Sequence, residues 1–250
     1  MEHPALRTRL AAEAARFQDA AAAADPDAAV PTCPAWTTTG LLDHVIDVYD
    51  HKIAAIRSGT APGGDYRTPR PGTLLDQYAG ALADLLAVFD DTTPDSPAHA
   101  WPGAEPTVGF WIRRLTHETL IHRVDAELAA ARAPGPIDTA LAEDGIDEML
   151  TVILDRGLSA HREHVSPALA SHAGLVVALD TGDRSWTVRV GDGTVDVADG
   201  ARPDAQALVR AEAGAVLQWL WQRLPAQALP AEGDAGRAAA LHAVMGAFGG

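Results

Sequence analysis

The sequence contains one cysteine, one lysine and few aromatic residues. Because Cys33 stands alone, the chain can form neither an internal disulfide nor an all-thiolate zinc site. Lys52 is the only lysine, and the 250 residues carry a formal net charge of −15, with acidic residues spread along the chain. Binding to nucleic-acid phosphates needs a clustered Lys/Arg surface, so this charge argues against nucleic acid and anionic membranes as partners.

Long hydrophobic runs are also missing. No apolar stretch approaches the roughly 20 residues that cross a bilayer. The first residues, MEHPALRTRLAAEAARF, are charged and amphipathic and lack the apolar core of a signal peptide. We therefore expect a cytoplasmic protein with no membrane partner. Hydrophobic residues make up 47% of the chain, a globular composition with enough length for one large domain or two modest ones.

The first part of the chain has the periodicity of helices. Apolar spacing, caps and proline or glycine breaks predict five helices, over residues 5–24, 37–57, 73–89, 107–131 and 139–164. Between the first two, Pro31 and Pro34 predict a rigid linker, because each proline fixes its own φ and biases its predecessor away from helix. Long helices with short or Pro-rich links predict an antiparallel four-helix type of bundle.

After His172 the periodicity changes to that of strands. Residues 174–180, 185–190 and 194–197 read as strands separated by Gly/Asp turns, and residues 204–210 as a fourth. Helices follow at 211–224 and 238–248. The fold class is therefore predicted to be α+β, with an N-terminal antiparallel helical bundle in residues 1–168 and a small α+β domain in residues 169–250.

The segment Phe110–Asp125 holds the most informative polar pattern. Glu118 and His122 are four residues apart, so on a helix their side chains share a face within reach of one ion. Arg114 lies one turn earlier on that face and Asp125 one turn later. Such a row of polar groups is also typical of a solvent-exposed stripe.

His44 lies among apolar residues on the predicted second helix. A lone histidine there is also typical of a core position with a satisfied hydrogen bond. Together with Glu118 and His122, however, it would complete a set of two imidazoles and one carboxylate, which is a common open metal site. Bundles build such sites from inward-facing residues of neighbouring helices. The three residues therefore predict one divalent metal ion inside the bundle.

Several stretches resemble one family, the mycothiol-dependent maleylpyruvate isomerases, whose members join a DinB-like helical bundle to a C-terminal domain of sterol-carrier type. The resemblance covers nearly the whole chain. It rests on Val30-Pro-Thr-Cys-Pro-Ala-Trp36 with Leu41-Leu42-Asp43-His44, on Arg113–Asp125, on Ala142–Glu148, and on Trp219-Leu-Trp-Gln-Arg223 with Glu232-Gly-Asp234.

The resemblance implies the cofactors and the site. It assigns His44, Glu118 and His122 as metal ligands, with zinc the usual ion, and mycothiol as the thiol cosubstrate. It also implies a functional arginine from the C-terminal domain. Arg223 is the best match, although Arg210 and Arg237 lie nearby in sequence. The alternative role for Arg223 is that of a cation favoured by the dipole at a helix C-terminus.

Other reactive or aromatic residues are assigned structural roles. Cys33 would need a nearby base to act as a nucleophile, and none is visible in the sequence. Trp36 is expected in the core or at a domain interface. His117 points roughly 100° away from Glu118 around the helix, so it is left out of the ligand set.

These residues lead to a hypothesis about function and two alternatives. The favoured activity is that of a metal-dependent, mycothiol-using enzyme, either a thiol S-transferase or a maleylpyruvate-type cis–trans isomerase, acting on a small electrophile. The first alternative is a zinc-dependent hydrolase on the same bundle, in which the metal activates water. The second is a non-catalytic member of the family that binds a small molecule.

Overall fold

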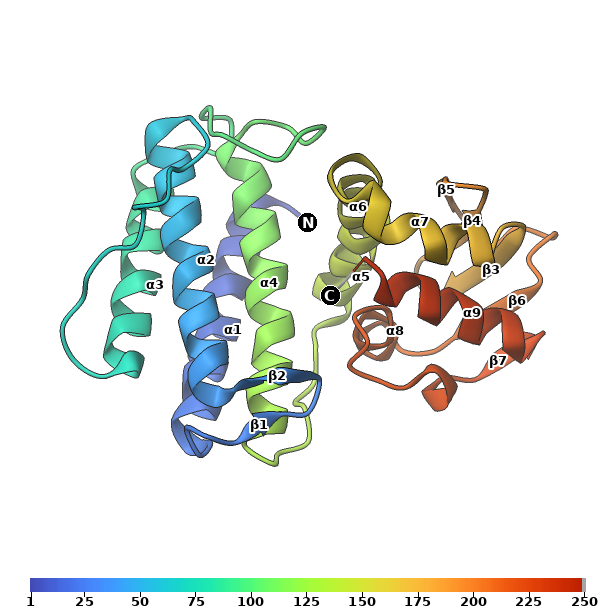
Figure 1. Ribbon diagram of the computed structural model, residues 1–250, viewed down its shortest axis with the longest axis horizontal. Coiled ribbons are helices and arrows are strands. Elements are labelled where there is room, and N and C mark those ends of the chain that lie inside the picture. The colour runs from blue at the N-terminus through green and yellow to red at the C-terminus, as the bar shows by residue number, and fades with distance from the viewer. Residues whose placement is uncertain (249–250) are drawn as a thin grey trace. The chain divides into compact units, whose positions relative to one another are not determined.

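The computed structural model describes residues 1–248 and divides the chain into two compact units, Met1–Gly135 and Pro136–Gly250. The first unit is a helical bundle, and the second combines helices with a sheet (Figure 1). This arrangement confirms the predicted α+β class. Within residues 1–248, no helix has both the length and the apolarity needed to cross a membrane.

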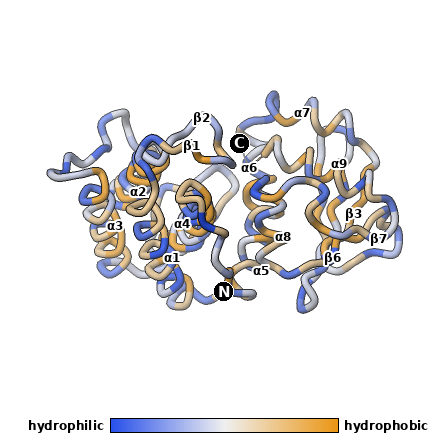
Figure 2. Tube along the Cα trace, turned by 90° about the horizontal axis from the view of Figure 1, so that it is seen from below, coloured by the Kyte–Doolittle hydropathy of each residue, from blue (hydrophilic) through white to orange (hydrophobic). Residues whose placement is uncertain are grey.

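Four helices build the first unit. They are α1 (His3–Ala23), α2 (Thr38–Ser58), α3 (Leu74–Asp90) and α4 (Val108–Ala129). Helix α1 packs along α4, α2 packs along α3, and α2 also contacts α4. Hydrophobic residues recur along each of these helices (Figure 2), and the apolar faces bury large side chains such as Phe17, Tyr49 and Trp111. Burial of these faces holds the bundle together.

Local signals explain where the bundle helices begin and end. The Thr37 hydroxyl accepts a hydrogen bond from the Gly40 amide and so caps α2. Thr73 and Asp76 form a reciprocal capping box at the start of α3. Helix α2 ends at Gly59, whose φ of 65° suits a residue without a Cβ. These caps lie close to the helix ends predicted from the sequence.

The segment before α2 is a two-stranded hairpin, which corrects the predicted linker. Strand β1 (Ala29–Val30) pairs antiparallel with β2 (Cys33–Thr37), with Val30 opposite Cys33. The fixed φ of proline is compatible with extended backbone, so the two prolines that suggested a linker are accommodated in and beside these strands. The hairpin contacts both α2 and α4.

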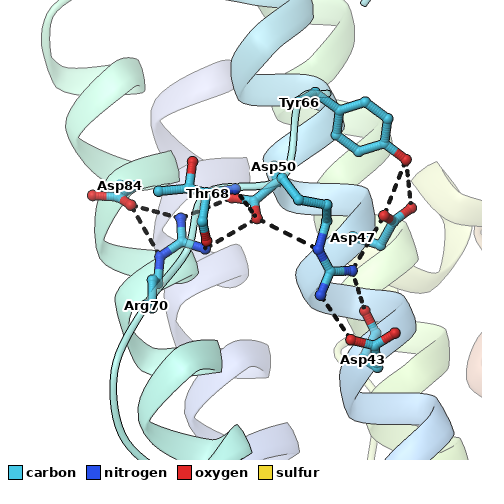
Figure 3. A network of polar contacts seen from close by, with 8 residues as sticks. Asp43, Asp47, Asp50, Tyr66, Thr68, Arg70 and Asp84 are labelled. Carbon is cyan, nitrogen blue, oxygen red and sulfur yellow. Dashed lines mark hydrogen bonds and ion pairs between the residues drawn. The ribbon is translucent and has the colours of Figure 1, made fainter. Parts of the chain in front are cut away.

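Ion pairs fasten the connection between α2 and α3 to α2 (Figure 3). Asp50, whose side chain is fully buried, accepts hydrogen bonds from both terminal nitrogens of Arg70, at 3.0 and 2.7 Å, and from the Thr68 amide at 3.1 Å. Two turns earlier along α2, Asp43 accepts a hydrogen bond from Arg67 Nη2 at 2.7 Å. This connection is therefore held at several points beside the helix that carries His44.

The second unit is built around a five-stranded sheet in the order β5-β4-β3-β6-β7. The strands are β3 (Leu175–Asp180), β4 (Ser185–Val190), β5 (Val195–Asp199), β6 (Ala207–Arg210) and β7 (Ala231–Gly233). Strand β3 is central and almost entirely buried; it pairs antiparallel with β4 and parallel with β6. Helix α8 (Ala213–Leu220) lies between β6 and β7 in the chain, and α9 (Ala235–Gly246) follows β7 and contacts β3 and β6.

The structure divides the chain at residues 135 and 136, whereas the sequence predicted a boundary at 168 and 169. Helix α5 (Thr139–Glu148) belongs with the sheet because the Thr181 hydroxyl donates to Glu143 at 2.6 Å and Arg184 pairs with Asp147 at 3.0 Å. The single helix predicted over 139–164 is also interrupted. A π-helical turn (Met149–Ile153) separates α5 from α6 (Leu154–Ala160), and α7 (Arg162–Ser171) follows.

Candidate metal centre

Two bundle helices bring the three predicted ligands together. His44 lies in the second turn of α2, while Glu118 and His122 lie one turn apart on α4. One ligand atom from each residue can be chosen so that all three lie within 4.8 Å of one another. Residues 74 positions apart in the chain therefore meet at one point. That they hold a metal ion stays a prediction.

Both imidazoles point at the same carboxylate oxygen. His44 Nε2 lies 3.3 Å from Glu118 Oε1, and His122 Nε2 lies 3.2 Å from that atom. The two rings stand nearly perpendicular, at 77°, with centroids 4.9 Å apart. Two nitrogens and one oxygen thus converge from three directions, with the same atom of each imidazole facing the centre.

Arg114 holds the other oxygen of Glu118. Its Nη2 donates to Glu118 Oε2 at 2.6 Å, from a position one turn earlier on α4. Burial alone would raise the pKa of Glu118, but Arg114, followed by hydrogen bonds from His122 and His44, holds that pKa well below its usual range. Glu118 is therefore ionised at neutral pH, and its Oε1 is the oxygen directed at the imidazoles.

Asp125 contacts the nitrogen of His122 that does not face Glu118. Asp125 Oδ2 lies 2.9 Å from His122 Nδ1, and the Asp125 side chain is fully buried. Burial alone would lower the pKa of His122, but hydrogen bonds to Asp125 and Glu118 outweigh it and raise the pKa to about 9. An ionised carboxylate only accepts hydrogen bonds, so Nδ1 donates to Asp125. With this pKa, Nε2 also carries a proton at neutral pH, and a metal ion would displace that proton in order to bind there.

The β1–β2 hairpin contacts both imidazoles and Asp125. The Trp36 ring lies 4.5 Å from the His44 ring and 5.8 Å from the His122 ring, measured between centroids. Thr32 Oγ1 donates to Asp125 Oδ1 at 2.6 Å, and Cys33 Sγ lies 3.9 Å from Asp125 Oδ2. The expectation of a core or interface position for Trp36 did not include this contact with both imidazoles.

The sequence indicated part of this surrounding shell. Arg114 and Asp125 were recognised on the same face of the helix as Glu118 and His122, although their contacts were not assigned. No signal pointed to Thr32, because its partner Asp125 lies 93 residues away. His117 is fully buried and is not part of the three-residue cluster.

The donor set fits a zinc-type ion. Structural and catalytic zinc sites use neutral imidazole and carboxylate ligands, and three protein ligands leave a position for substrate or water. The orientation of the two imidazoles toward Glu118, and the hydrogen bond from His122 Nδ1 to Asp125, are the arrangement that such ligands need.

Arg223 lies in the second unit, just after α8. Its amide donates to the Gln218 carbonyl at 2.7 Å, and its Nη1 donates to the Trp221 carbonyl, also at 2.7 Å. The neighbouring Gln222 has a φ of 63°, as expected for the residue that closes a helix with a Schellman turn. These contacts match the alternative role at a helix C-terminus, and a role for Arg223 in catalysis stays a prediction.

The other two arginines considered from the sequence have acidic partners in the second unit. Arg210 pairs with Asp180 and with Glu232, each at 3.2 Å. Arg237 Nε lies 3.9 Å from Asp234.

The N-terminal unit matches a known family. Residues 7–127 match the family described as "Mycothiol maleylpyruvate isomerase N-terminal domain", which confirms the resemblance over that part of the chain. The match includes all three residues of the cluster.

Other comparisons add little. No curated protein matches the sequence. Among solved structures, the chain is similar to one described as "UbiJ-SCP2 Ubiquinone synthesis protein", with 22% identity over 45% of this chain and 93% of that chain, at a TM-score of 0.31. A TM-score of 0.31 does not establish a shared fold, so the sterol-carrier type of the second unit stays a prediction.

Proposed function

Since residues 7–127 match the family of mycothiol maleylpyruvate isomerase N-terminal domains, we propose that this protein is a metal-dependent enzyme that uses mycothiol as its thiol cosubstrate. The reaction is either S-transfer to a small electrophile or cis–trans isomerisation of one. A single observation carries the proposal: His44, Glu118 and His122 converge within the domain that matches this family. A cytoplasmic location is part of the same proposal.

The residues of the chain prepare the site for a cation. His44 and His122 each offer one Nε2, and Glu118 offers one oxygen of an ionised carboxylate. Arg114 binds the second oxygen of Glu118 and so favours coordination through Oε1 alone. A divalent ion bound there would lower the pKa of a bound thiol, so that a thiolate exists at neutral pH.

The chemistry follows from thiol addition to a carbon–carbon double bond. In S-transfer, a sulfur–carbon bond forms, the π bond breaks, and the proton lost by the thiol ends on the neighbouring carbon. In isomerisation, the same sulfur–carbon bond forms, the former double bond rotates, and the sulfur–carbon bond then breaks. That last step restores the double bond in its trans form and regenerates the thiol.

Arg223 is the proposed partner for the charge of the substrate. A guanidinium binds a carboxylate through two parallel hydrogen bonds and stabilises a developing enolate oxygen. This assignment rests on the family resemblance of Trp219–Arg223.

Metal analysis of the purified protein, combined with a mycothiol-consumption assay over a panel of electrophiles, tests the proposal. We expect about one equivalent of zinc and turnover that requires both the ion and mycothiol. Loss of free thiol with formation of an adduct would identify a transferase, and a trans product with thiol conserved would identify an isomerase.

Two other results would overturn the proposal. Turnover with metal but without mycothiol would indicate a hydrolase. Absence of both metal and turnover would indicate a non-catalytic binding protein. His122→Ala is the variant expected to lose the ion, and His164→Ala is its control, because His164 is exposed and lies outside the cluster.

A further inference from the structure

The carboxylate of Asp125 lies directly behind a proposed metal ligand. Its Oδ2 is 2.9 Å from His122 Nδ1, one turn along α4. The side chain of Asp125 has no solvent exposure, and that of His122 has 9%. Water therefore has little access to replace this hydrogen bond, and the orientation of the imidazole depends on the carboxylate.

The hairpin holds this carboxylate in turn. Thr32, between β1 and β2, donates its hydroxyl proton to Asp125 Oδ1 at 2.6 Å. One oxygen of Asp125 thus accepts from the Thr32 hydroxyl, and the other accepts from the histidine. Cys33 Sγ also lies 3.9 Å from Oδ2. A chain of contacts runs from the hairpin through Asp125 to His122, and its far end is the Nε2 atom that faces Glu118.

We propose that Asp125 is a positioning residue of the metal centre, and that Thr32 holds Asp125 in the orientation that presents His122 Nε2 to the ion. This inference rests on the proposed metal site. Its physical basis is that a carboxylate bound to the second nitrogen of a ligating histidine sets its tautomer and ring orientation and raises its basicity.

A purely structural role is the competing explanation. Asp125 is buried, and its bond to Thr32 also ties the hairpin to α4, so its loss would destabilise the fold whether or not a metal binds. Stability and metal affinity separate the two explanations. A structural contact changes the unfolding midpoint of the metal-free protein, whereas a positioning contact changes the metal dissociation constant of the folded protein.

The experiment measures zinc affinity of the full-length protein by competition with a chelator, and the visible absorption of the cobalt(II) form. We expect Asp125→Asn to bind zinc about 10–100-fold more weakly than the wild type, the usual effect of altering such a partner. Thr32→Val should also weaken zinc binding, but by a smaller factor. Thr32→Ser keeps the hydroxyl, so its zinc affinity should equal that of the wild type. The cobalt(II) spectrum should shift in the two weakened variants.

The double variant tests whether the residues act as one chain. Thr32→Val should have a smaller effect on zinc affinity in the Asp125→Asn background than in the wild type. In that background residue 125 is already a weaker partner of His122, so loss of the Thr32 hydrogen bond to it should matter less. Should Asp125→Asn not fold, the Thr32 pair carries the test alone.

Two matched control variants alter side chains that bind partners other than Asp125 and His122. Asp50→Asn alters an equally buried carboxylate that binds Arg70 and Thr68. Thr39→Val removes a hydroxyl whose acceptor is the Pro26 carbonyl, at 2.9 Å. Both should leave the zinc affinity and the cobalt(II) spectrum unchanged, even where the unfolding midpoint falls.

Unchanged affinity and spectrum in Asp125→Asn and Thr32→Val, with lowered unfolding midpoints, would overturn the positioning role and leave the proposed function intact. A wild-type protein that binds neither zinc nor cobalt(II) would overturn both. The two failures are therefore distinguishable in the same titration.

Discussion

Glu118 divides its two oxygens between a cation and a pair of imidazoles. Oε2 binds Arg114 at 2.6 Å, while Oε1 lies 3.2 Å from His122 Nε2 and 3.3 Å from His44 Nε2. Without a counter-charge, a partly buried carboxylate and two closely spaced imidazoles would be costly to hold together. Arg114 supplies this counter-charge and so helps to hold the three side chains in the arrangement that the proposed metal site needs.

The role of the three ligands leads to the first prediction. His122→Ala and Glu118→Gln should each weaken zinc binding by more than the roughly 10–100-fold that loss of an outer partner costs, because two remaining ligands hold zinc poorly. Metal content after dialysis, read together with a far-UV spectrum to show that the fold persists, gives the measurement. Retention of stoichiometric zinc by either variant would contradict the ligand assignment.

Arg223 is predicted to affect turnover without affecting metal content. If it stabilises charge on the substrate, Arg223→Ala should keep the ion and lose about 10²–10³-fold in kcat. Steady-state rates and metal analysis of the same sample provide the test. Arg189→Ala is the control, because Arg189 lies in the same unit and pairs with Asp204 on the surface.

Full activity of Arg223→Ala would refute the assignment. The remaining question would then be whether Arg210→Ala or Arg237→Ala lowers kcat, since these are the other arginines nearby in sequence.

At the scale of elements, α2 contributes His44 to the candidate site and also binds the segment that connects it to α3. One face carries His44 toward α4, and another carries Asp43, Asp47 and Asp50, which bind the connecting segment (Figure 3). Residues three or four apart on a helix share a face, so the helix keeps these two sets of side chains apart. The position of this connection is therefore tied to the helix that carries one of the three ligands.

Within this network, the buried ion pair of Asp50 with Arg70 should contribute most to the free energy of unfolding. Asp50→Asn should lower the free energy of unfolding by about 3 kcal/mol, near the lower end for loss of one partner of a buried pair, because Asp84 still binds Arg70 at 2.6 Å. Asp84→Asn is the comparison. Its side chain is 46% exposed, so we expect a loss below about 1 kcal/mol. Urea unfolding measures both, and equal losses would show that burial does not decide the contribution.

At the scale of the whole molecule, the proposed ion lies in one of two compact units. All three ligands belong to Met1–Gly135, and each unit has its own buried core. Binding of a ligand to the folded state alone stabilises that state in proportion to the logarithm of the free ligand concentration. The ion should therefore act first on the helical bundle.

Thermal unfolding with zinc and with a chelator tests this expectation. Free zinc at about 100 times its dissociation constant should stabilise the bundle by about 2.7 kcal/mol. Hydrogen exchange should slow in α2 and α4, with the sheet strands β3 and β4 less affected. His122→Ala should abolish the effect. Slower exchange confined to the sheet would place the ion elsewhere.

Most elements could be predicted because their signals are local. The spacing of apolar residues and caps such as Thr37 and Thr73 predicted α1 to α4 to within a few residues. A continuous apolar run of β type predicted β3, and alternation predicted β4. The short strand β7 was not predicted. Neither was the π-helical turn after Glu148, where Thr151 Oγ1 donates to the Asp147 carbonyl at 2.7 Å. Such features depend on packing more than on periodicity.

By itself, the sequence determined the helical pattern and the shared face of Glu118 and His122, because side chains four apart on a helix meet whatever surrounds them. Their place beside His44, 74 residues from Glu118, was a hypothesis until α2 and α4 were seen in contact. Only the tertiary structure decided that Thr32 reaches Asp125 across 93 residues, and that α5 joins the sheet instead of the bundle. These contacts depend on how complete elements pack, and no local preference of the chain records that packing.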